Sequence, residues 1–526
     1  MEKSKKVFIY DTTLRDGSQT EGISYSLQDK INIAKRLDDF GFDFIEGGWP
    51  YSNQKDKDFF DYFKKHPLKV SKLVPFGSTA HPSSIVQKDK NLIALAESET
   101  EYVTVFGKSW DLHVKEVLKI GLKDNLRIIS QSIKFLRKSG KKVFYDAEHF
   151  FDGYKNNPAY ALDTIKAANQ AGAELIVFCD TNGGVLPWEV KDIIRAIKKK
   201  KLLAAFGMHC HNDLGLAVAN SLVCVDDGCL HIQGTVNGYG ERCGNTDLVT
   251  VIGVLQLKMN TCVVPEPRLS QLSHLSHFVS EISNMVHRDN YPFVGRSAFA
   301  HKAGVHVDAV RKNPRAYEHI NPEKVGAASR FIISELAGKS TLVAKAKELA
   351  YALDKKSPQA KKIHSLVQEM ERQGYQFEAA EASFKLLLHK EFKQHKKFFD
   401  LMGFKVVVEK REDGKLISEA TIKLKIGDKL EHTASEGDGP VNALDNALRK
   451  ALIKYYPILA SMHLADFKVR VLDEKGGTAA KVRVLIESQD EKDSWSTVGL
   501  SENVIEASWQ ALVDSVEYKL LKDNKK

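Results

Sequence analysis

Two histidines one residue apart, in the stretch "HCHNDLG" at 209–215, have the spacing of a chelating pair. They follow an apolar run, "AAFGM", that is typical of a buried strand. Because side chains two apart in an extended segment point the same way, His209 and His211 are expected to face one site while Cys210 faces away. A lone histidine is usually a core or hydrogen-bonded residue, whereas this pair at a strand end favours a metal site.

Two other stretches offer further ligands for this site. "YDTTLRDGSQ" at 10–19 brings Asp16 close behind an apolar run, and "GYGERCGN" at 238–245 offers Glu241 and Asn245. A carboxylate, two imidazoles and an amide oxygen leave room for water and substrate oxygens, so the site suits Mg²⁺, Mn²⁺ or Zn²⁺ acting as a Lewis acid. The predicted metal ligands are Asp16, His209, His211 and Asn245.

Arg15 places a fixed positive charge next to the predicted ligand Asp16. A guanidinium there can stabilise negative charge that develops on an oxygen of the substrate. The alternative interpretation is a surface ion pair between Arg15 and Asp16. Neighbouring side chains in an extended segment point in opposite directions, so this pairing is disfavoured.

The first half of the chain alternates β-rich apolar runs with helical periods, which predicts a (β/α)₈ TIM barrel. After Ser26, for example, Ile31, Ala34 and Leu37 share a helix face that ends at Gly41. An open, doubly wound sheet is the alternative. The barrel is favoured because most runs end in polar residues, which a barrel gathers at one mouth. The runs are 7–11, 42–48, 72–77, 101–107, 142–148, 175–183, 204–211 and 231–240.

The pattern changes after the barrel. A charged helical run occupies 341–374, and from 391 onward a strand-strand-strand-helix pattern occurs twice. Such a duplicated βββα unit is typical of a small binding domain. We therefore expect a catalytic barrel at 1–285, a helical region at 286–390 that completes the site, and a C-terminal α+β domain at 391–526.

Composition limits the classes of partner. The net charge of +9 comes from scattered lysines, without a basic arm interleaved with aromatics, so nucleic-acid binding is weakly supported and anionic small molecules fit equally well. No apolar run is long enough to span a bilayer, and the first strand begins too early for a signal peptide. The spacing of the six cysteines matches no zinc motif. We expect a cytoplasmic protein without membrane or nucleic-acid partners.

The three motifs "DTTLRDGSQ", "HCHNDLG" and "GERCGN" together resemble one family of metal-dependent barrel enzymes. It contains the isopropylmalate, homocitrate and citramalate synthases and hydroxymethylglutaryl-CoA lyase. "HKAGVHVDAV" at 301–310 and "YEHINPEKVG" at 317–326 resemble the subdomain of the synthases, and the duplicated C-terminal region resembles their allosteric domain. The lyase lacks that region, so a synthase is favoured.

The resemblance implies an acyltransferase that condenses acetyl-CoA with a 2-oxo acid in a Claisen-type reaction and hydrolyses the thioester. It implies a homodimer in which residues of the subdomain close the neighbouring subunit's site. A Glu148–His306 pair is a reasonable proton acceptor. Alternatively, Glu148 only accepts a substrate hydrogen bond and His306 is structural. By this resemblance the catalytic residues are Arg15, Glu148, His306 and Tyr317, and Thr181 contacts substrate.

The stretch "EGGWPYSNQKDKDFF" at 46–60 resembles the citramalate-forming branch, which implies pyruvate as the 2-oxo acid. Substrate selection is expected around Glu46, Trp49 and Asp146, where Asp146 departs from the apolar lining of some pyruvate-specific members. The resemblance implies isoleucine as the feedback effector. The alternatives are 2-oxoisovalerate or 2-oxoglutarate as substrate, a lyase or aldolase, and a non-catalytic amino-acid sensor, although a sensor need not keep Asp16 and both histidines.

Overall fold

The computed structural model describes residues 6–203, 205–332, 339–349, 351–472 and 480–523. The chain divides into two compact units, which are described separately. One comprises residues 1–299 with 319–329, and the other comprises 300–318 with 330–526. Among the described residues, no helix is long and apolar enough to cross a membrane.

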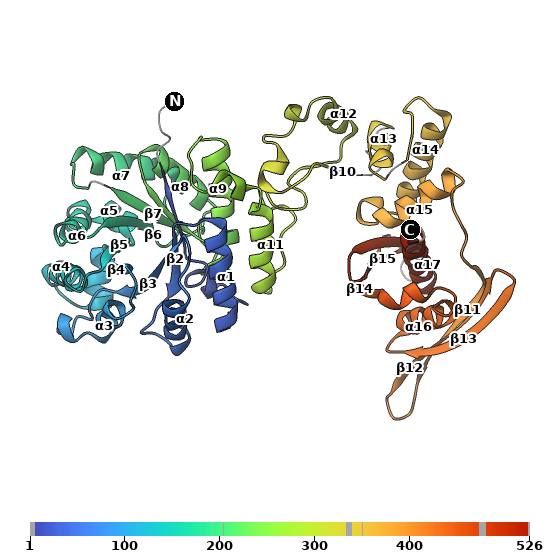
Figure 1. Ribbon diagram of the computed structural model, residues 1–526, viewed down its shortest axis with the longest axis horizontal. Coiled ribbons are helices and arrows are strands. Elements are labelled where there is room, and N and C mark those ends of the chain that lie inside the picture. The colour runs from blue at the N-terminus through green and yellow to red at the C-terminus, as the bar shows by residue number, and fades with distance from the viewer. Residues whose placement is uncertain (1–5, 204, 333–338, 350, 473–479, 524–526) are drawn as a thin grey trace. The chain divides into compact units, whose positions relative to one another are not determined.

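The first unit is built on a closed barrel of eight parallel strands, in which β1 pairs with both β2 and β8 (Figure 1). This confirms the predicted TIM barrel and excludes the open sheet. The strands are β1 (Phe8–Asp11), β2 (Phe44–Gly48), β3 (Lys72–Ser78), β4 (Tyr102–Lys108), β5 (Lys142–Glu148), β6 (Leu175–Asp180), β7 (Phe206–Cys210) and β8 (His231–Gly234).

Helices on the outside of the barrel connect successive strands (Figure 1). Their apolar faces pack on the strands in one continuous core. The helices of this unit are α1 (Leu27–Phe40), α2 (Gln54–Lys65), α3 (Lys90–Ala96), α4 (Leu122–Lys138), α5 (Phe150–Asn156), α6 (Pro158–Gln170), α7 (Pro187–Lys199), α8 (Ala217–Asp226), α9 (Leu248–Leu257), α10 (Glu266–Leu269) and α11 (Leu272–Ile282).

The ends of α1 show how local sequence sets these helices. Ser26 accepts a hydrogen bond from the Asp29 backbone N–H, at 3.1 Å, and the Asp29 carboxylate accepts one from the Ser26 backbone N–H, at 2.8 Å. This reciprocal cap satisfies donors that the first turn leaves unpaired. Gly41 ends the helix with φ +102°, a conformation that favours glycine. The sequence predicted both ends of this helix.

Aromatic side chains fill the amino-terminal end of the barrel. Tyr10, Phe44 and Phe144 pack around the His231 ring, with centroids 5.1 to 5.7 Å from it. This end is a packed core rather than a pore. The polar side chains that could do chemistry therefore gather at the carboxyl ends of the strands.

The second unit begins with a small helical region. The charged run at 341–374 forms part of α13 and then α14, which begins at Pro358 with Ser357 as its cap. Residue 350 lies outside the described residues. The elements are β9 (Ala300–His301), α12 (Gly304–Lys312), β10 (Arg330–Phe331), α13 (Lys339–Glu348), α14 (Pro358–Gln373), η7 (Phe377–Ala379) and α15 (Glu381–Glu391).

The predicted duplicated βββα unit is confirmed at the C-terminal end. Each copy is a three-stranded antiparallel sheet followed by a helix. The first repeat contains β11 (Asp400–Lys410), β12 (Leu416–Ile426), β13 (Lys429–Gly437) and α16 (Pro440–Leu452), and the short helix η8 (Pro457–Ser461) follows it. The second repeat contains β14 (His463–Val471), β15 (Val482–Gln489), β16 (Ser494–Ser501) and α17 (Val504–Asp523). The two repeats share one apolar core.

Candidate active site

A cavity of about 250 Å³ opens at the carboxyl end of the barrel, and every strand contributes to its wall directly or through the loop that follows it. We call it the mouth cavity. Its lining includes Arg15, Asp16, Asp146, Glu148, Thr181, His209 and His211. Together with Trp49 and Glu241, nine of the residues that the sequence singled out therefore lie around one space in the barrel.

Asp16, His209 and His211 form a buried cluster whose potential ligand atoms all lie within 4.8 Å of one another. The Nε2 atom of His209 lies 3.4 Å from Oδ2 of Asp16, and Nε2 of His211 lies 3.7 Å from the same oxygen. All three residues are buried. The geometry is that of a preformed site for one small cation.

Asn245 is also buried and pairs with His211 through a backbone bridge between the loops after β7 and β8. Neither of its amide atoms makes a hydrogen bond of normal geometry within the described part of the chain. Glu241, the other candidate of that loop, is exposed and lies 3.6 Å from the Arg242 guanidinium. Asn245 therefore fits a buried ligand set better than Glu241.

The loop after β8 depends on a close backbone approach at Gly244. It has φ +87°, and a Cβ there would lie 2.0 Å from the Gly238 carbonyl oxygen. Arg242 ties this loop to the preceding one, because its Nε donates to Asp213 at 2.8 Å. These contacts position Asn245 next to the histidine pair.

Unsatisfied polar atoms test whether the site fits a metal. Asp16 Oδ1, His211 Nδ1 and both amide atoms of Asn245 are buried without a hydrogen-bond partner among the described residues. Buried polar atoms are normally paired, so such a concentration at one point calls for a ligand. Carboxylate, imidazole and amide oxygen are ligands of the divalent cations Mg²⁺, Mn²⁺ and Zn²⁺. The residues present fit such an ion.

The protonation states also fit a metal site. Burial raises the pKa of Asp16, but the charges of Arg15, His209 and His211 outweigh it and lower that pKa to about 2. Burial lowers the pKa of His209, and lowers that of His211 to about 4. At neutral pH the carboxylate is therefore ionised and both imidazoles are neutral, as metal ligands must be.

Arg15 is held in the wall of the mouth cavity by three contacts. Its Nε donates to Oε1 of Glu46 at 2.5 Å, its Nη1 lies 3.3 Å from Oδ2 of Asp16, and its guanidinium carbon lies 3.9 Å from the ring centroid of Phe76. The expectation that Arg15 and Asp16 do not pair is wrong. The chain turns after β1, with the Gly17 N–H bonded to the Thr12 carbonyl, so strand alternation does not apply.

Glu46, which the sequence placed at the substrate, lies beneath Arg15. Its carboxylate is 0% exposed and accepts hydrogen bonds from the Tyr10 hydroxyl at 2.5 Å and the Thr12 hydroxyl at 2.6 Å, as well as from Arg15. The two hydroxyl contacts hold the Glu46 carboxylate where it meets the Arg15 guanidinium. Sequence reasoning missed Tyr10 and Thr12, although both stand in the same "YDTTLRD" stretch.

A buried relay connects the cavity wall to His209. His209 donates from Nδ1 to Oε1 of Gln233 at 2.9 Å, and Nε2 of Gln233 donates to Oδ1 of Asp146 at 3.2 Å. This arrangement leaves Nε2 of His209 free to face Asp16. Burial and the nearby Glu46 raise the pKa of Asp146 well above its usual value. Sequence reasoning missed Gln233, although β8 places it two residues after the inward-facing His231.

Glu148 and Thr181 form the opposite side of the mouth cavity. The Glu148 carboxylate forms an ion pair with the Lys108 ammonium group. Thr181 accepts a hydrogen bond from the His149 backbone N–H at 2.8 Å, so its own hydroxyl hydrogen is available to another acceptor. The His149 backbone has φ +52°, an uncommon conformation for a residue other than glycine.

His306 and Tyr317 lie in the second unit, which the structure describes separately from the barrel. Their rings are close together, with centroids 4.2 Å apart. His306 is exposed on α12, and Tyr317 is 47% exposed. His306 and Tyr317 therefore lie next to each other in the second unit. The predicted site residues of the barrel form a separate group around the mouth cavity.

An aromatic wall completes the mouth cavity. The rings of Phe76 and Phe106 are stacked with centroids 5.3 Å apart, and Trp49 meets both edge-on at 5.8 and 5.9 Å. The Trp49 indole is fixed by its hydrogen bond to Asn91 at 2.7 Å. This wall gives the cavity a rigid apolar side opposite the polar cluster.

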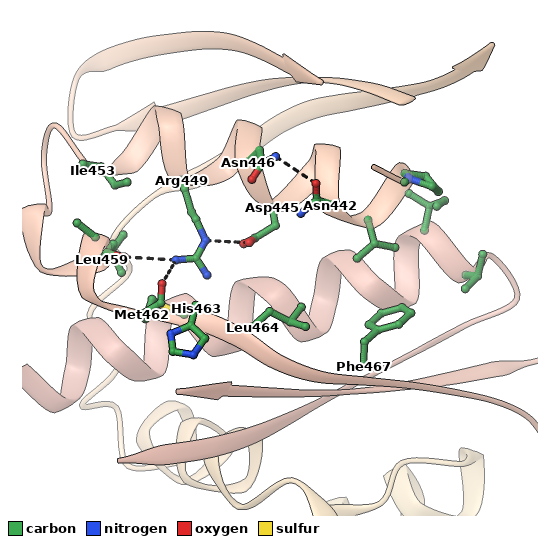
Figure 2. Close-up of a pocket in the computed structure, with 16 residues that line it drawn as sticks. Asn442, Asp445, Asn446, Arg449, Ile453, Leu459, Met462, His463, Leu464 and Phe467 are labelled. Carbon is green, nitrogen blue, oxygen red and sulfur yellow. Dashed lines mark hydrogen bonds and ion pairs between the residues drawn. The ribbon is translucent and has the colours of Figure 1, made fainter. Parts of the chain in front are cut away.

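A second cavity, of about 840 Å³, lies between the two C-terminal repeats (Figure 2). We call it the α16 cavity, because residues of α16 line one side of it and η8, β14 and the start of α17 line the rest. Arg449 donates to Asp445 at 2.8 Å and to the Met462 carbonyl at 2.6 Å. Its charge is therefore compensated within the protein, and Leu464 and Phe467 supply apolar walls.

Three protein families match successive parts of the chain. The HMGL-like family matches residues 6–279, the homocitrate synthase post-HMGL domain-like family matches 293–374, and the LeuA allosteric (dimerisation) domain matches 378–520. The first of these matches covers the whole barrel and every barrel residue of the site.

Full-length relatives agree with this order of families. The chain is 53% identical over 521 residues to an (R)-citramalate synthase of Aquifex aeolicus, covering 99% of each chain, and 52% identical to one of Geobacter sulfurreducens, covering 98% of each. It is 30% identical to a 2-isopropylmalate synthase of Methanocaldococcus jannaschii, with 99% of this chain and 96% of the relative covered. The chain belongs to the HMGL-like family, in the group that contains the (R)-citramalate synthases.

Proposed function

We propose that this protein is an (R)-citramalate synthase, which condenses acetyl-CoA with pyruvate and hydrolyses the thioester to release (R)-citramalate and CoA. The observation that carries the proposal is the similarity over nearly the whole chain to enzymes of that name, in a protein whose barrel keeps the buried Asp16, His209 and His211 cluster. Similarity without the cluster would also fit a sensor that had lost catalysis.

Asp16, His209, His211 and Asn245 are the residues that would hold a divalent cation, in keeping with their unpaired buried atoms. When bound, the cation supplies Lewis acidity toward the 2-oxo acid. Arg15, fixed between Glu46 and Asp16, places positive charge where the pyruvate carbonyl oxygen becomes an alkoxide. Glu46 is thus a positioning residue in this proposal.

Thr181 is proposed to orient the pyruvate carboxylate. Its oxygen already accepts the His149 N–H, so its hydroxyl donates outward into the mouth cavity. A neutral donor at one side and Arg15 at the other would fix the planar acid in one orientation. Fixing both ends of a small substrate in this way lowers the entropy cost of the condensation.

Proton removal from the acetyl methyl group is assigned to Glu148 together with His306 and Tyr317. Glu148 lines the mouth cavity, and its ion pair with Lys108 orients the carboxylate. The adjacent rings of His306 and Tyr317 form a unit that could close over a barrel, which by family resemblance belongs to the neighbouring subunit of a homodimer. Asp146 is proposed to contact substrate and to support the relay to His209.

The aromatic wall favours pyruvate over larger 2-oxo acids. In this proposal the methyl group of pyruvate faces Phe76, Phe106 and Trp49, whose rings are packed against one another and disfavour a larger side chain. The cavity of about 250 Å³ is small for a substrate plus the acetyl end of CoA. Because one methylene is worth only about 1–3 kcal/mol, some activity with 2-oxobutyrate is expected.

A thiol-release assay with acetyl-CoA tests the reaction and the substrate together. Pyruvate, 2-oxobutyrate, 2-oxoisovalerate and 2-oxoglutarate are compared under the same divalent metal. The expected kcat/KM is highest for pyruvate and lower for 2-oxobutyrate. A preference for 2-oxoisovalerate would instead assign isopropylmalate synthesis, and no thiol release with any of the acids would contradict a condensing enzyme.

Glu148→Gln separates the base from a residue that only binds substrate. The variant is expected to lower kcat much more than it weakens pyruvate binding, because the amide cannot accept the methyl proton. Exchange of the acetyl-CoA methyl protons with solvent is measured in Glu148→Gln and in His306→Ala. Unchanged exchange in both variants would show that another group is the base.

The C-terminal region is proposed to be regulatory, with isoleucine as the effector and the α16 cavity as its site. In this scheme residues 1–285 are catalytic, 286–390 complete the site and 391–526 bind the effector and form the dimer. The match to the LeuA allosteric (dimerisation) domain and the position of the cavity between the two repeats support it. A chain truncated near residue 390 should keep some catalysis and lose inhibition, and inhibition that survives truncation would place the effector elsewhere.

A further inference from the structure

The aromatic wall of the mouth cavity is built from three successive β/α units of the barrel. Phe76 and Phe106 lie within β3 and β4, whereas Trp49 stands just after β2, in the loop that leads to α2. A side chain on a strand is held by the sheet, but a side chain on a loop depends on the contacts that the loop makes. The contacts of Trp49 therefore set the shape of this wall.

Asp56, on α2, fixes the backbone of Trp49. Its Oδ2 accepts a hydrogen bond from the Trp49 backbone N–H at 2.8 Å, and its Oδ1 forms an ion pair with the buried Lys30 ammonium group of α1. Gly48 has φ +135°, and a Cβ there would lie 2.4 Å from Cγ of Asp56, so glycine is needed for the chain to approach this carboxylate. With its backbone held, the indole can move only by rotation about its side-chain bonds.

Asn91, on α3, fixes the indole itself. Its Oδ1 accepts a hydrogen bond from Nε1 of Trp49 at 2.7 Å, and its Nδ2 donates to the Ser78 carbonyl oxygen at 2.7 Å. A flipped amide would place donor against donor and acceptor against acceptor, so the two partners specify one orientation of this buried side chain. The Trp49 ring is thereby tied to the end of β3.

Asn91 is held firmly in its turn. The preceding residue but one, Asp89, caps α3, because its carboxylate accepts hydrogen bonds from the Leu92 N–H at 3.1 Å and the His81 N–H at 2.9 Å. A Cβ at Gly77 would lie 2.6 Å from Oδ1 of Asn91, so the glycine lets β3 pass close to the amide. Helix and strand together make Asn91 a rigid support for the ring.

The next β/α unit has an amide in the corresponding place. Asn125, on α4, is buried and donates from Nδ2 to the carbonyl oxygen of Lys108, the last residue of β4, at 2.8 Å. Its second contact is with the Tyr160 hydroxyl, also at 2.8 Å. Both amides therefore join a helix to the end of the preceding strand. Of the two, Asn91 also holds a residue that lines the mouth cavity.

The position of Trp49 matters for the reaction because the wall contacts Arg15. The guanidinium carbon of Arg15 lies 3.9 Å from the ring centroid of Phe76. Phe76 is stacked on Phe106, and Trp49 meets both rings edge-on. An indole that turned away from Asn91 would open space beside these two rings, next to the group that faces the substrate carbonyl in the proposed function.

We propose that Asn91 is a specificity-determining residue: by holding the Trp49 ring, it sets the size of the 2-oxo acid side chain that the mouth cavity accepts. Asn91 is a positioning residue, since it acts through Trp49. This inference rests on the proposed function, because it concerns the acid that is condensed. The contacts of Asn91 do not include Arg15 or the predicted metal ligands, so its loss should change selectivity and spare the metal site.

Asn91→Leu tests the proposal, with Asn125→Leu as the matched control. Each variant removes the hydrogen bonds of one buried amide at nearly the same volume. The measured quantity is kcat/KM for 2-oxobutyrate divided by kcat/KM for pyruvate, which does not depend on the fraction of the preparation that is active. We expect this ratio to rise about tenfold in Asn91→Leu, as when one methylene is no longer rejected, and to stay at the wild-type value in Asn125→Leu. An equal rise in both variants would indicate general loosening of the barrel and overturn the proposal.

A double variant shows whether Asn91 acts through Trp49. Trp49→Phe keeps a ring but removes the N–H that Asn91 holds. In the Trp49→Phe background, adding Asn91→Leu should leave the selectivity ratio within about twofold, because the interaction is already lost. A second full rise in the double variant would mean that Asn91 acts by another route, which contradicts its proposed role.

Binding of the two acids gives a readout that does not require turnover. Dissociation constants for pyruvate and 2-oxobutyrate are measured by calorimetric titration of the full-length protein with Mg²⁺ and without acetyl-CoA. Asn91→Leu should shift the ratio of these constants toward 2-oxobutyrate and leave Mg²⁺ affinity unchanged. Absence of thiol release by the wild type would contradict the proposed function, and the ratio of dissociation constants would still test Asn91. A ratio that is the same in Asn91→Leu and the wild type would overturn this inference, as would a wild type that binds neither acid.

Discussion

The barrel mouth and the α16 cavity treat buried charge in opposite ways. At the mouth, Asp16 and the two histidines converge with unpaired atoms, and Glu46 holds Arg15 at their side. In the α16 cavity, the charge of Arg449 is compensated by its ion pair with Asp445 and by hydrogen bonds to backbone carbonyls. A site for chemistry keeps charge uncompensated until a cofactor and substrate arrive, whereas a site for reversible binding can be neutral when empty. Variants at the barrel mouth should therefore lose metal binding or turnover, whereas variants in the α16 cavity should lose inhibition and keep turnover.

The largest effect is expected from His209→Ala. It removes one of three clustered ligand groups, so divalent metal binding should weaken sharply and thiol release should fall to background. Metal content after dialysis and turnover with pyruvate measure the two losses. Full activity with unchanged metal content would contradict the metal site. An exposed histidine far from the cluster in sequence, His66, is the matched control for His→Ala and should leave both quantities unchanged.

Arg15→Gln should have the next largest effect. The amide keeps a donor but loses the positive charge opposite the developing alkoxide, so we expect kcat to fall about 10²–10³-fold. Metal affinity should change little or rise, because Arg15 lies 3.3 Å from the ligand Asp16 and competes with the cation for its charge. Kinetics and metal titration on the same preparation check this split. A loss confined to metal affinity would show that Arg15 only organises Asp16.

Gln233→Leu tests the support behind a ligand rather than the ligand itself. It removes the acceptor for His209 Nδ1 and the donor to Asp146, while filling a similar volume. Metal affinity should weaken about 10–100-fold, as for other partners of metal-binding histidines. Titration with Co²⁺, followed by its visible spectrum, reports both affinity and geometry. Gln233→Glu retains an acceptor for Nδ1 and should recover part of the affinity, which a purely steric role would not explain.

The sequence predicted those features that follow from the regular geometry of a single strand or helix. Six of the eight barrel strands lie within a predicted apolar run, and β3 and β4 each extend one residue beyond theirs, because strands buried on both faces are nearly continuous in hydrophobicity. The duplicated βββα pattern was equally visible, since amphipathic strands and helices alternate in a fixed order. His209 and His211 share a site because residues two apart in an extended strand do so.

The same reasoning failed where the backbone leaves the regular element or the partner is distant. Arg15 and Asp16 pair because the chain turns after β1, which strand alternation cannot describe. Gln233 reaches Asp146 across the barrel, over 87 residues of sequence. The α16 cavity is built from ordinary side chains of several elements, so no single stretch marks it. Only the fold reveals such sites.

A variant of the α16 cavity should separate inhibition by the effector from turnover. Leu464→Phe places a larger ring in the α16 cavity beside Phe467. If isoleucine binds there, its inhibition constant should rise by about tenfold or more, while kcat and KM without isoleucine stay within about twofold. Steady-state kinetics with and without isoleucine measure this. Unchanged inhibition would move the effector out of this cavity, and a large loss of turnover would show that the two regions are not independent.

The smallest effect on activity, and a distinct one on stability, is expected from His231→Phe in the barrel core. Burial alone lowers the pKa of His231 to about 3, and its ring lies among Tyr10, Phe44 and Phe144. Because the unfolded chain binds a proton near pH 6.5 and the folded chain does not, stability is lost as pH falls from about 6.5 toward 3, by about 1.4 kcal/mol per pH unit. His231→Phe should remove this loss, so its Tm should fall less than that of the wild type between pH 7 and pH 4.5, with activity at pH 7.5 unchanged.

The exposed His66, replaced in the same way, should leave the wild-type slope intact. An identical acid slope in the wild type and His231→Phe would show that the acid sensitivity of the barrel comes from its mouth, where burial lowers the pKa of His211 to about 4, and not from its core.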